Sequence, residues 1–171
     1  MRITPAVVAE EHEWVRERAP VVALINATRR DLGERFATDV DDVTVDQYHR
    51  AVDEVFADGD RAVNVAALVR LLRNLDVVGD YPGFVVDELL GRELAGTIAG
   101  TQPLRLLGEA TFHYADVAIE EADGSAGVED GDPAGLDDLD AALAAGFQTR
   151  LPGWEWREGA SPFAVDPADT G

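Results

Sequence analysis

Apolar residues recur every three or four positions along most of the first 120 residues, and this spacing predicts helices. In the clearest run, residues 20–36, one residue in each turn lies on the same face: Val21, Ile25, Thr28, Leu32 and Phe36. Arg29, Arg30 and Glu34 are then expected on the other side. Similar spacing predicts helices at 5–17, 44–57, 64–76, 84–100 and 135–147. The expected fold class is therefore mainly α, a compact bundle of five or six helices.

Residues 103–119 fit two patterns. Leu107, Ala110, Tyr114 and Val117 suit a helix, whereas Phe112, Tyr114, Val117 and Ile119 could instead form an edge strand. One short edge strand near 111–119 therefore stays open as an alternative to a helix.

The composition changes after residue 120, which divides the expected domain into three parts. Residues 1–120 form the helical core. Residues 121–134 are rich in Asp, Glu and Gly, a composition typical of a solvated loop. Residues 135–171 hold a short amphipathic helix and a C-terminal arm. The arm is expected to pack on the same domain, because it contains Trp154, Trp156 and Phe163.

Two ten-residue stretches, 36–45 and 56–65, resemble each other at an offset of 20 residues. In each, a helix is expected to end at a buried phenylalanine, Phe36 or Phe56. A polar loop and a core valine, Val43 or Val63, then precede the residue that caps the next helix. Thr44 and Gln47 form a capping box, and Asn64 is the expected cap in the second copy. Asp58-Gly59-Asp60 resembles a calcium loop but lacks ligands at its first and last positions, which favours a capped turn.

Charge is the strongest compositional signal. The chain carries 34 acidic and 14 basic residues, a formal net charge of −20, and every basic residue is arginine. Such a surface repels itself in dilute salt, whereas a Debye length of about 3 Å in molar salt removes most of the repulsion. This composition resembles that of proteins from halophiles with molar salt in the cytoplasm. A DNA mimic, the rival hypothesis, would gather its acids in one stripe, but here they are spread along the chain.

Other features of the composition limit the kinds of cross-link, metal site and membrane segment that the chain can have. There is no cysteine, so disulfides and thiolate metal sites are excluded. No apolar run exceeds five residues, far short of the roughly 20 that cross a bilayer. A soluble, cytoplasmic protein without a membrane partner is expected.

Two histidines have carboxylates at helical spacing and are candidate metal ligands. His49 lies between Asp46 and Asp53, and His113 lies between Glu109 and Asp116. On helices, each set forms one strip, and two facing strips would resemble a carboxylate–histidine metal site inside a bundle. Acids are so frequent in this chain that the same spacing also arises by chance.

A second candidate is DNA recognition by a helix-turn-helix formed by residues 44–57 and 64–76. Arg70, Arg73 and Asn74 share the face opposite Leu68 and Leu72. Arginine and asparagine commonly read guanine and adenine edges. The loop expected between these helices is longer than the three or four residues of that motif.

No phosphate-binding glycine loop or nucleophile elbow occurs in the sequence. The expected function is a binding or regulatory module without catalytic activity, with a protein partner or a second copy of the chain as compatible partners. It requires no cofactor. A helix-turn-helix DNA-binding regulator and a metal-dependent enzyme with a divalent ion remain the alternatives.

Overall fold

The computed structural model describes residues 1–75, 80–123 and 135–154. These residues form helices and no strand, so the mainly α class is confirmed. The described residues contain seven helices, and the expected count of five or six is not confirmed. The helices are α1 (Pro5–Arg16), α2 (Ala19–Phe36), α3 (Val45–Ala57), α4 (Gly59–Arg73), α5 (Asp80–Ala99), α6 (Leu104–Asp123) and α7 (Gly135–Gln148).

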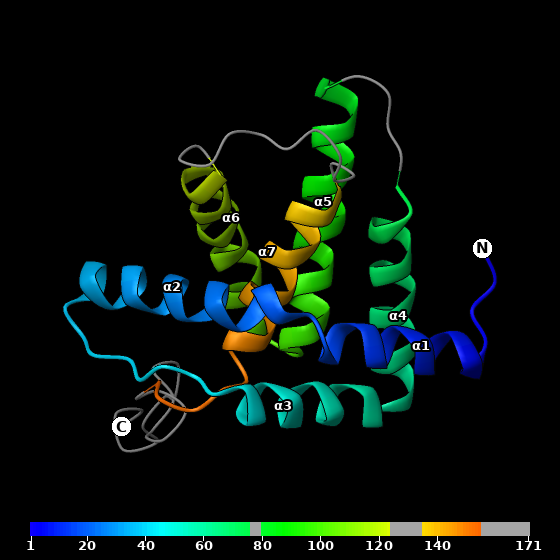
Figure 1. Cartoon of the computed structure of the whole chain (residues 1–171), viewed down its shortest axis with the longest axis horizontal. Helices are drawn as coiled ribbons and strands as arrows, with labels where there is room; N and C mark the ends of the chain where they lie inside the picture. The colour runs from blue at the N-terminus through cyan, green and yellow to red at the C-terminus, as the bar shows by residue number, and fades with distance from the viewer. Residues whose placement is uncertain (76–79, 124–134, 155–171) are drawn as a thin grey trace, which may run out of the picture.

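Helix α7 is the centre of the molecule, packed against α2, α4, α5 and α6 (Figure 1). Every residue from Leu139 to Thr149 is buried, so α7 beyond its first turn is enclosed on all sides rather than amphipathic as the sequence predicted. Its small residues permit close approach of its neighbours. A Cβ on Gly146 would lie 2.7 Å from Ile98 Cβ of α5, so only glycine allows this contact.

The other helices complete the core around α7. Figure 1 shows α1 and α2 following one another across the bundle, with α3 roughly parallel below them. The Tyr48 hydroxyl of α3 donates to the Val15 carbonyl of α1 at 2.7 Å, and burial strongly raises the pKa of this phenol. Val52 of α3 and Val65 and Val69 of α4 are fully buried. Within the described part of the chain, no helix has both the length and the apolar character needed to cross a membrane.

The strand alternative near 111–119 is wrong, because these residues lie within α6. Gly108, Thr111, Phe112 and Ala115 are buried at helical spacing, and α6 packs against α5 and α7. The helix also includes residues 121–123, which were expected in the acidic loop. The rest of that loop, 124–134, and arm residues 155–171 lie outside the described residues. Within the described part of the arm, Leu151 and Trp154 are buried.

The proposed repeat holds in its first copy only in part and fails in its second. Thr44 and Gln47 do form the capping box, and Val43 is buried. Phe36, however, is 74% exposed, because it lies in the last turn of α2, which extends beyond α6 and α7 (Figure 1).

In the second copy the predicted loop is absent. Helix α4 already begins at Gly59, and Asp58 is its N-cap, with its side chain accepting from the Arg61 N–H at 3.4 Å. Asn64 therefore lies inside the helix, and Val63 is 45% exposed. Asp58, which the sequence placed in a polar loop, is thus the cap of a helix.

Candidate functional site

An apolar cavity of about 320 Å³ lies between α2, α6 and the segment that follows α7. Its apolar wall consists mainly of Leu32, Phe36, Val40, Leu107, Tyr114 and Trp154. Three polar residues, Thr38, Thr111 and Gln148, also line it, and none of the lining residues that the structure describes is charged at neutral pH. This volume is at the lower end of the range of small-molecule pockets, which are mostly apolar with few polar groups.

One wall of the cavity is the chain segment that leaves α2. Ala37 has a left-handed backbone, with φ of 51°, and the Thr38 N–H donates to the Gly33 carbonyl at 2.9 Å. A Cβ on Gly33 would lie 2.7 Å from the Thr38 oxygen, so glycine is needed for this turn. The Asn26 amide then pairs with both the N–H and the carbonyl of Val43, at 2.7 and 3.1 Å. Residues 38–43 are thereby held against α2.

A buried arginine joins this wall to the end of α7. Arg29 is fully buried and donates to the carbonyls of Asp41, Pro152 and Gln148, at 3.0, 2.8 and 3.1 Å. Its guanidinium also lies 5.4 Å from the centre of the Trp154 ring, a cation–π distance. A cation near the C-terminal carbonyls of a helix is stabilised by the helix dipole. Arg29 therefore holds the lining residues Trp154 and Gln148 in place, although the sequence predicted it on the solvent side.

Gln148 provides the most unusual polar group of the cavity. Its side chain is fully buried, and its Nε2 lies 3.3 Å from Thr111 Oγ1. Thr111 Oγ1 in turn lies 2.9 Å from the Leu107 carbonyl. The Gln148 Oε1 atom has no hydrogen-bond partner among the residues that the structure describes. Most buried polar atoms in proteins are hydrogen-bonded, so a partnerless acceptor beside a cavity is a notable exception.

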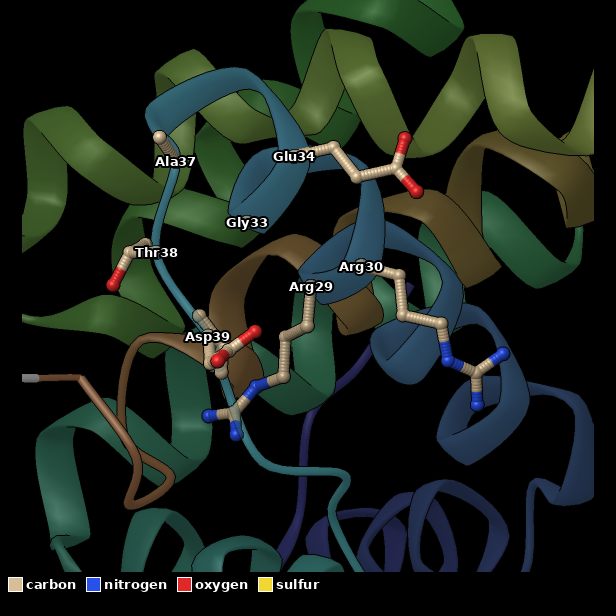
Figure 2. Close-up of a pocket in the computed structure, with 8 residues that line it drawn as sticks. Arg29, Arg30, Gly33, Glu34, Ala37, Thr38 and Asp39 are labelled. Carbon is tan, nitrogen blue, oxygen red and sulfur yellow. The ribbon is translucent and has the colours of Figure 1, made fainter.

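A larger and more polar cleft, of about 420 Å³, lies next to this cavity and shares Thr38 and Val40 with it. Figure 2 shows that its charged side chains point in different directions rather than to a common centre. Arg30 pairs with Asp42 at 2.8 Å, and this hydrogen bond and charge raise the pKa of Arg30. Arg29 donates to backbone carbonyls. We therefore regard the smaller apolar cavity as the better candidate site.

The predicted metal ligands lie on α3 and α6, two helices that each pack on α7. His12 of α1, which the sequence did not select, lies 2.7 Å from Asp53, and Arg16 lies 3.2 Å from the same oxygen. Glu109 pairs with Arg105 at 3.0 Å. Asp46 and His113 are exposed, and His49 is half-buried. Among the described residues, no three His, Asp or Glu side chains are grouped closely enough to hold a metal.

Two of the three predicted DNA-reading residues, Arg70 and Arg73, face α1. Arg73 lies 2.6 Å from the fully buried Glu11 and 4.4 Å from the centre of the Trp14 ring. Arg70 pairs with Glu10 at 3.2 Å, and Asn74 donates to the Arg70 carbonyl at 2.7 Å. The helices α3 and α4 are separated by Asp58 alone, so the long loop expected between them is wrong.

Sequence reasoning missed Arg29, Thr111 and Gln148. Arg29 follows Ile25 by four residues and precedes Leu32 by three, so the spacing placed it within reach of the apolar stripe. Thr111 lies four residues after Leu107 and four before Ala115, which is also helical spacing. A polar residue inside an apolar stripe was the available signal for both. Gln148 has no such signal, because it follows the helix predicted at 135–147, although in the structure it is the last residue of α7.

The described residues define a helical domain with an apolar pocket that is open to the surface at Phe36 and Ala110. The chain belongs to a family described as a domain of unknown function, DUF7984, whose model matches residues 1–167. No curated protein and no solved structure matches the chain.

Proposed function

We propose that this protein is a non-catalytic binding module that holds a small molecule in its apolar cavity. The observation that carries this proposal is the cavity itself, about 320 Å³ in volume and lined by apolar and aromatic side chains from two helices and two loops. Pockets of this kind are the usual sites of small-molecule binding.

The alternative functions receive less support. Arg70 and Arg73 pair with acids of α1, so a DNA ligand would have to compete with those contacts. The two histidine strips lie on separate helices, α3 and α6, and among the described residues no three His, Asp or Glu side chains are grouped closely enough to hold a metal. The setting that we propose is a cytoplasm of high salt, on the strength of the net charge of −20.

The experiment is titration of the protein with indole, a small aromatic probe, followed by NMR. Resonances of residues around the cavity should shift with saturation. Ala110 is exposed at the cavity and can accept a larger side chain, so Ala110→Phe should fill the space and reduce binding at least tenfold. Ala9→Phe places the same side chain on an exposed site of α1 and should leave binding unchanged. Equal binding by both variants, or no binding by the wild type, would contradict the proposal.

A further inference from the structure

The hydrogen bonds around Gln148 have a direction, and that direction decides which atom of the amide is left over. A threonine hydroxyl has one hydrogen to donate. Within the described part of the chain, Thr111 Oγ1 donates to the carbonyls of Leu107 and Gly108, at 2.9 and 3.3 Å, so its hydrogen is used there. Towards Gln148, Thr111 can then only accept. The amide must present its Nε2 to Thr111, and Oε1 is the atom that remains.

The buried Oε1 is an acceptor that lacks a donor. A buried polar group without a partner costs about 1–3 kcal/mol. The structure orients Nε2 towards Thr111; the exchanged orientation would require the Thr111 hydroxyl to give up the Leu107 and Gly108 carbonyls and would leave Nε2 unpaired instead. The cost is removed when a molecule in the cavity supplies an N–H or O–H.

The rest of the lining restricts the ligand further. None of the described residues that line the cavity carries a charge at neutral pH, and the nearby guanidinium groups of Arg29 and Arg35 lie 5.4 and 5.2 Å from the ring centres of Trp154 and Tyr114. Burial of an unpaired charge is far more costly than burial of a neutral polar group. The aromatic rings of Phe36, Tyr114 and Trp154 favour an apolar or aromatic body.

We infer that the ligand is a neutral, largely apolar molecule that carries one hydrogen-bond donor, and that Gln148 Oε1 accepts from this donor. The inference rests on the proposed function, because it assumes that the cavity binds small molecules. Gln148 is the residue that determines specificity, and Thr111 orients its amide. A site built around one hydrogen bond discriminates strongly against an analogue that lacks the matching group.

The test compares indole with benzofuran, which has nearly the same size and shape but a ring oxygen in place of the N–H. Calorimetry on the full chain should show indole binding to the wild type at least about tenfold more tightly than benzofuran, the ratio that corresponds to one unmade hydrogen bond at a buried acceptor. In Gln148→Leu, which removes the acceptor at similar volume, the two affinities should become equal. Leu139→Met, a buried change on α7 away from the cavity lining, should keep the preference for indole.

The outcomes separate this inference from the proposed function. If both probes bind the wild type equally, the donor requirement is overturned and the cavity remains a binding site. If neither probe binds, the proposed function itself is overturned. Because the first comparison uses only the wild-type protein, a folding defect in Gln148→Leu does not remove the test.

Discussion

Arg29 connects parts of the chain that are far apart in sequence. Its three carbonyl partners, Asp41, Gln148 and Pro152, belong to the segment after α2, the end of α7 and the segment that follows it. No other single side chain type has five donors in a planar group, so arginine is suited to several acceptors in different directions. The cost of burying its charge is offset by these hydrogen bonds and by the carbonyl end of α7.

Replacing Arg29 by methionine should therefore be strongly destabilising. The change leaves the buried carbonyls without this donor, and we expect the free energy of unfolding to fall by about 3–5 kcal/mol. Urea denaturation followed by circular dichroism measures this loss. Arg30→Met is the matched control, since Arg30 is exposed and pairs with an exposed Asp42. Similar urea midpoints for the two variants would show that Arg29 does not have this role.

At the residue scale, the sequence predicted which apolar residues are buried better than it predicted which polar residues form a site. Val21, Ile25 and Leu32 are buried as their spacing indicates. The histidines were chosen for their acidic neighbours along the helix, but His12 meets Asp53 from another helix. Spacing reports neighbours within one element, and contacts between elements depend on packing that a single sequence does not contain.

Asp58 illustrates how the boundary between two elements is set. Alone between Ala57 and Gly59, it ends α3 and caps α4. The N-terminal turn of a helix has unpaired N–H groups, and a carboxylate there satisfies one of them and interacts favourably with the helix dipole. Asn64 also has the side chain of a good cap, but it lies inside α4 and its capping ability is unused.

The two residues should respond differently to alanine. Asp58→Ala should lower the free energy of unfolding by about 0.5–2 kcal/mol, through loss of the cap. Asn64→Ala should be neutral or stabilising by up to about 0.7 kcal/mol, because alanine has the higher propensity inside a helix. Thermal and urea denaturation of both variants gives these values. A larger loss for Asn64→Ala than for Asp58→Ala would mean that α4 begins where the sequence first indicated.

Most helices were predictable at the element scale, while their ends and surroundings were less so. Period and capping signals located α2 and α3 almost to the residue. Residues 111–119 were ambiguous, because apolar residues there satisfy both periods, and contacts of α6 with α5 and α7 decide the outcome. The burial of α7 on all sides was not apparent, since alanine and glycine are compatible with both exposed and buried positions.

For the whole molecule, charge is the dominant property. The chain has twenty more acidic than basic residues, and the negative charges repel one another. Ion pairs such as Arg18–Asp140 and Arg73–Glu11 offset only part of this repulsion. Exposed pairs contribute little individually, so the long-range repulsion remains in dilute solution.

Stability should therefore rise with salt concentration. Between about 0.1 M and 2 M KCl, where screening becomes nearly complete, we expect the melting temperature to increase by at least about 5 °C. Differential scanning fluorimetry gives the melting temperature. The double variant Glu13→Lys/Glu54→Lys reduces the negative charge at two exposed positions and should show a smaller increase. An unchanged melting temperature in the wild type would contradict the proposed high-salt setting.

The central position of α7 also has a consequence for synthesis. It is the last of the described helices along the chain, yet α2, α4, α5 and α6 all pack on it. A ribosome adds about 5–20 residues per second, so the apolar faces of these earlier helices wait several seconds for their common partner. Complete folding during translation is therefore postponed until residues 139–149 are available, and the nascent chain is a natural client for chaperones during that interval.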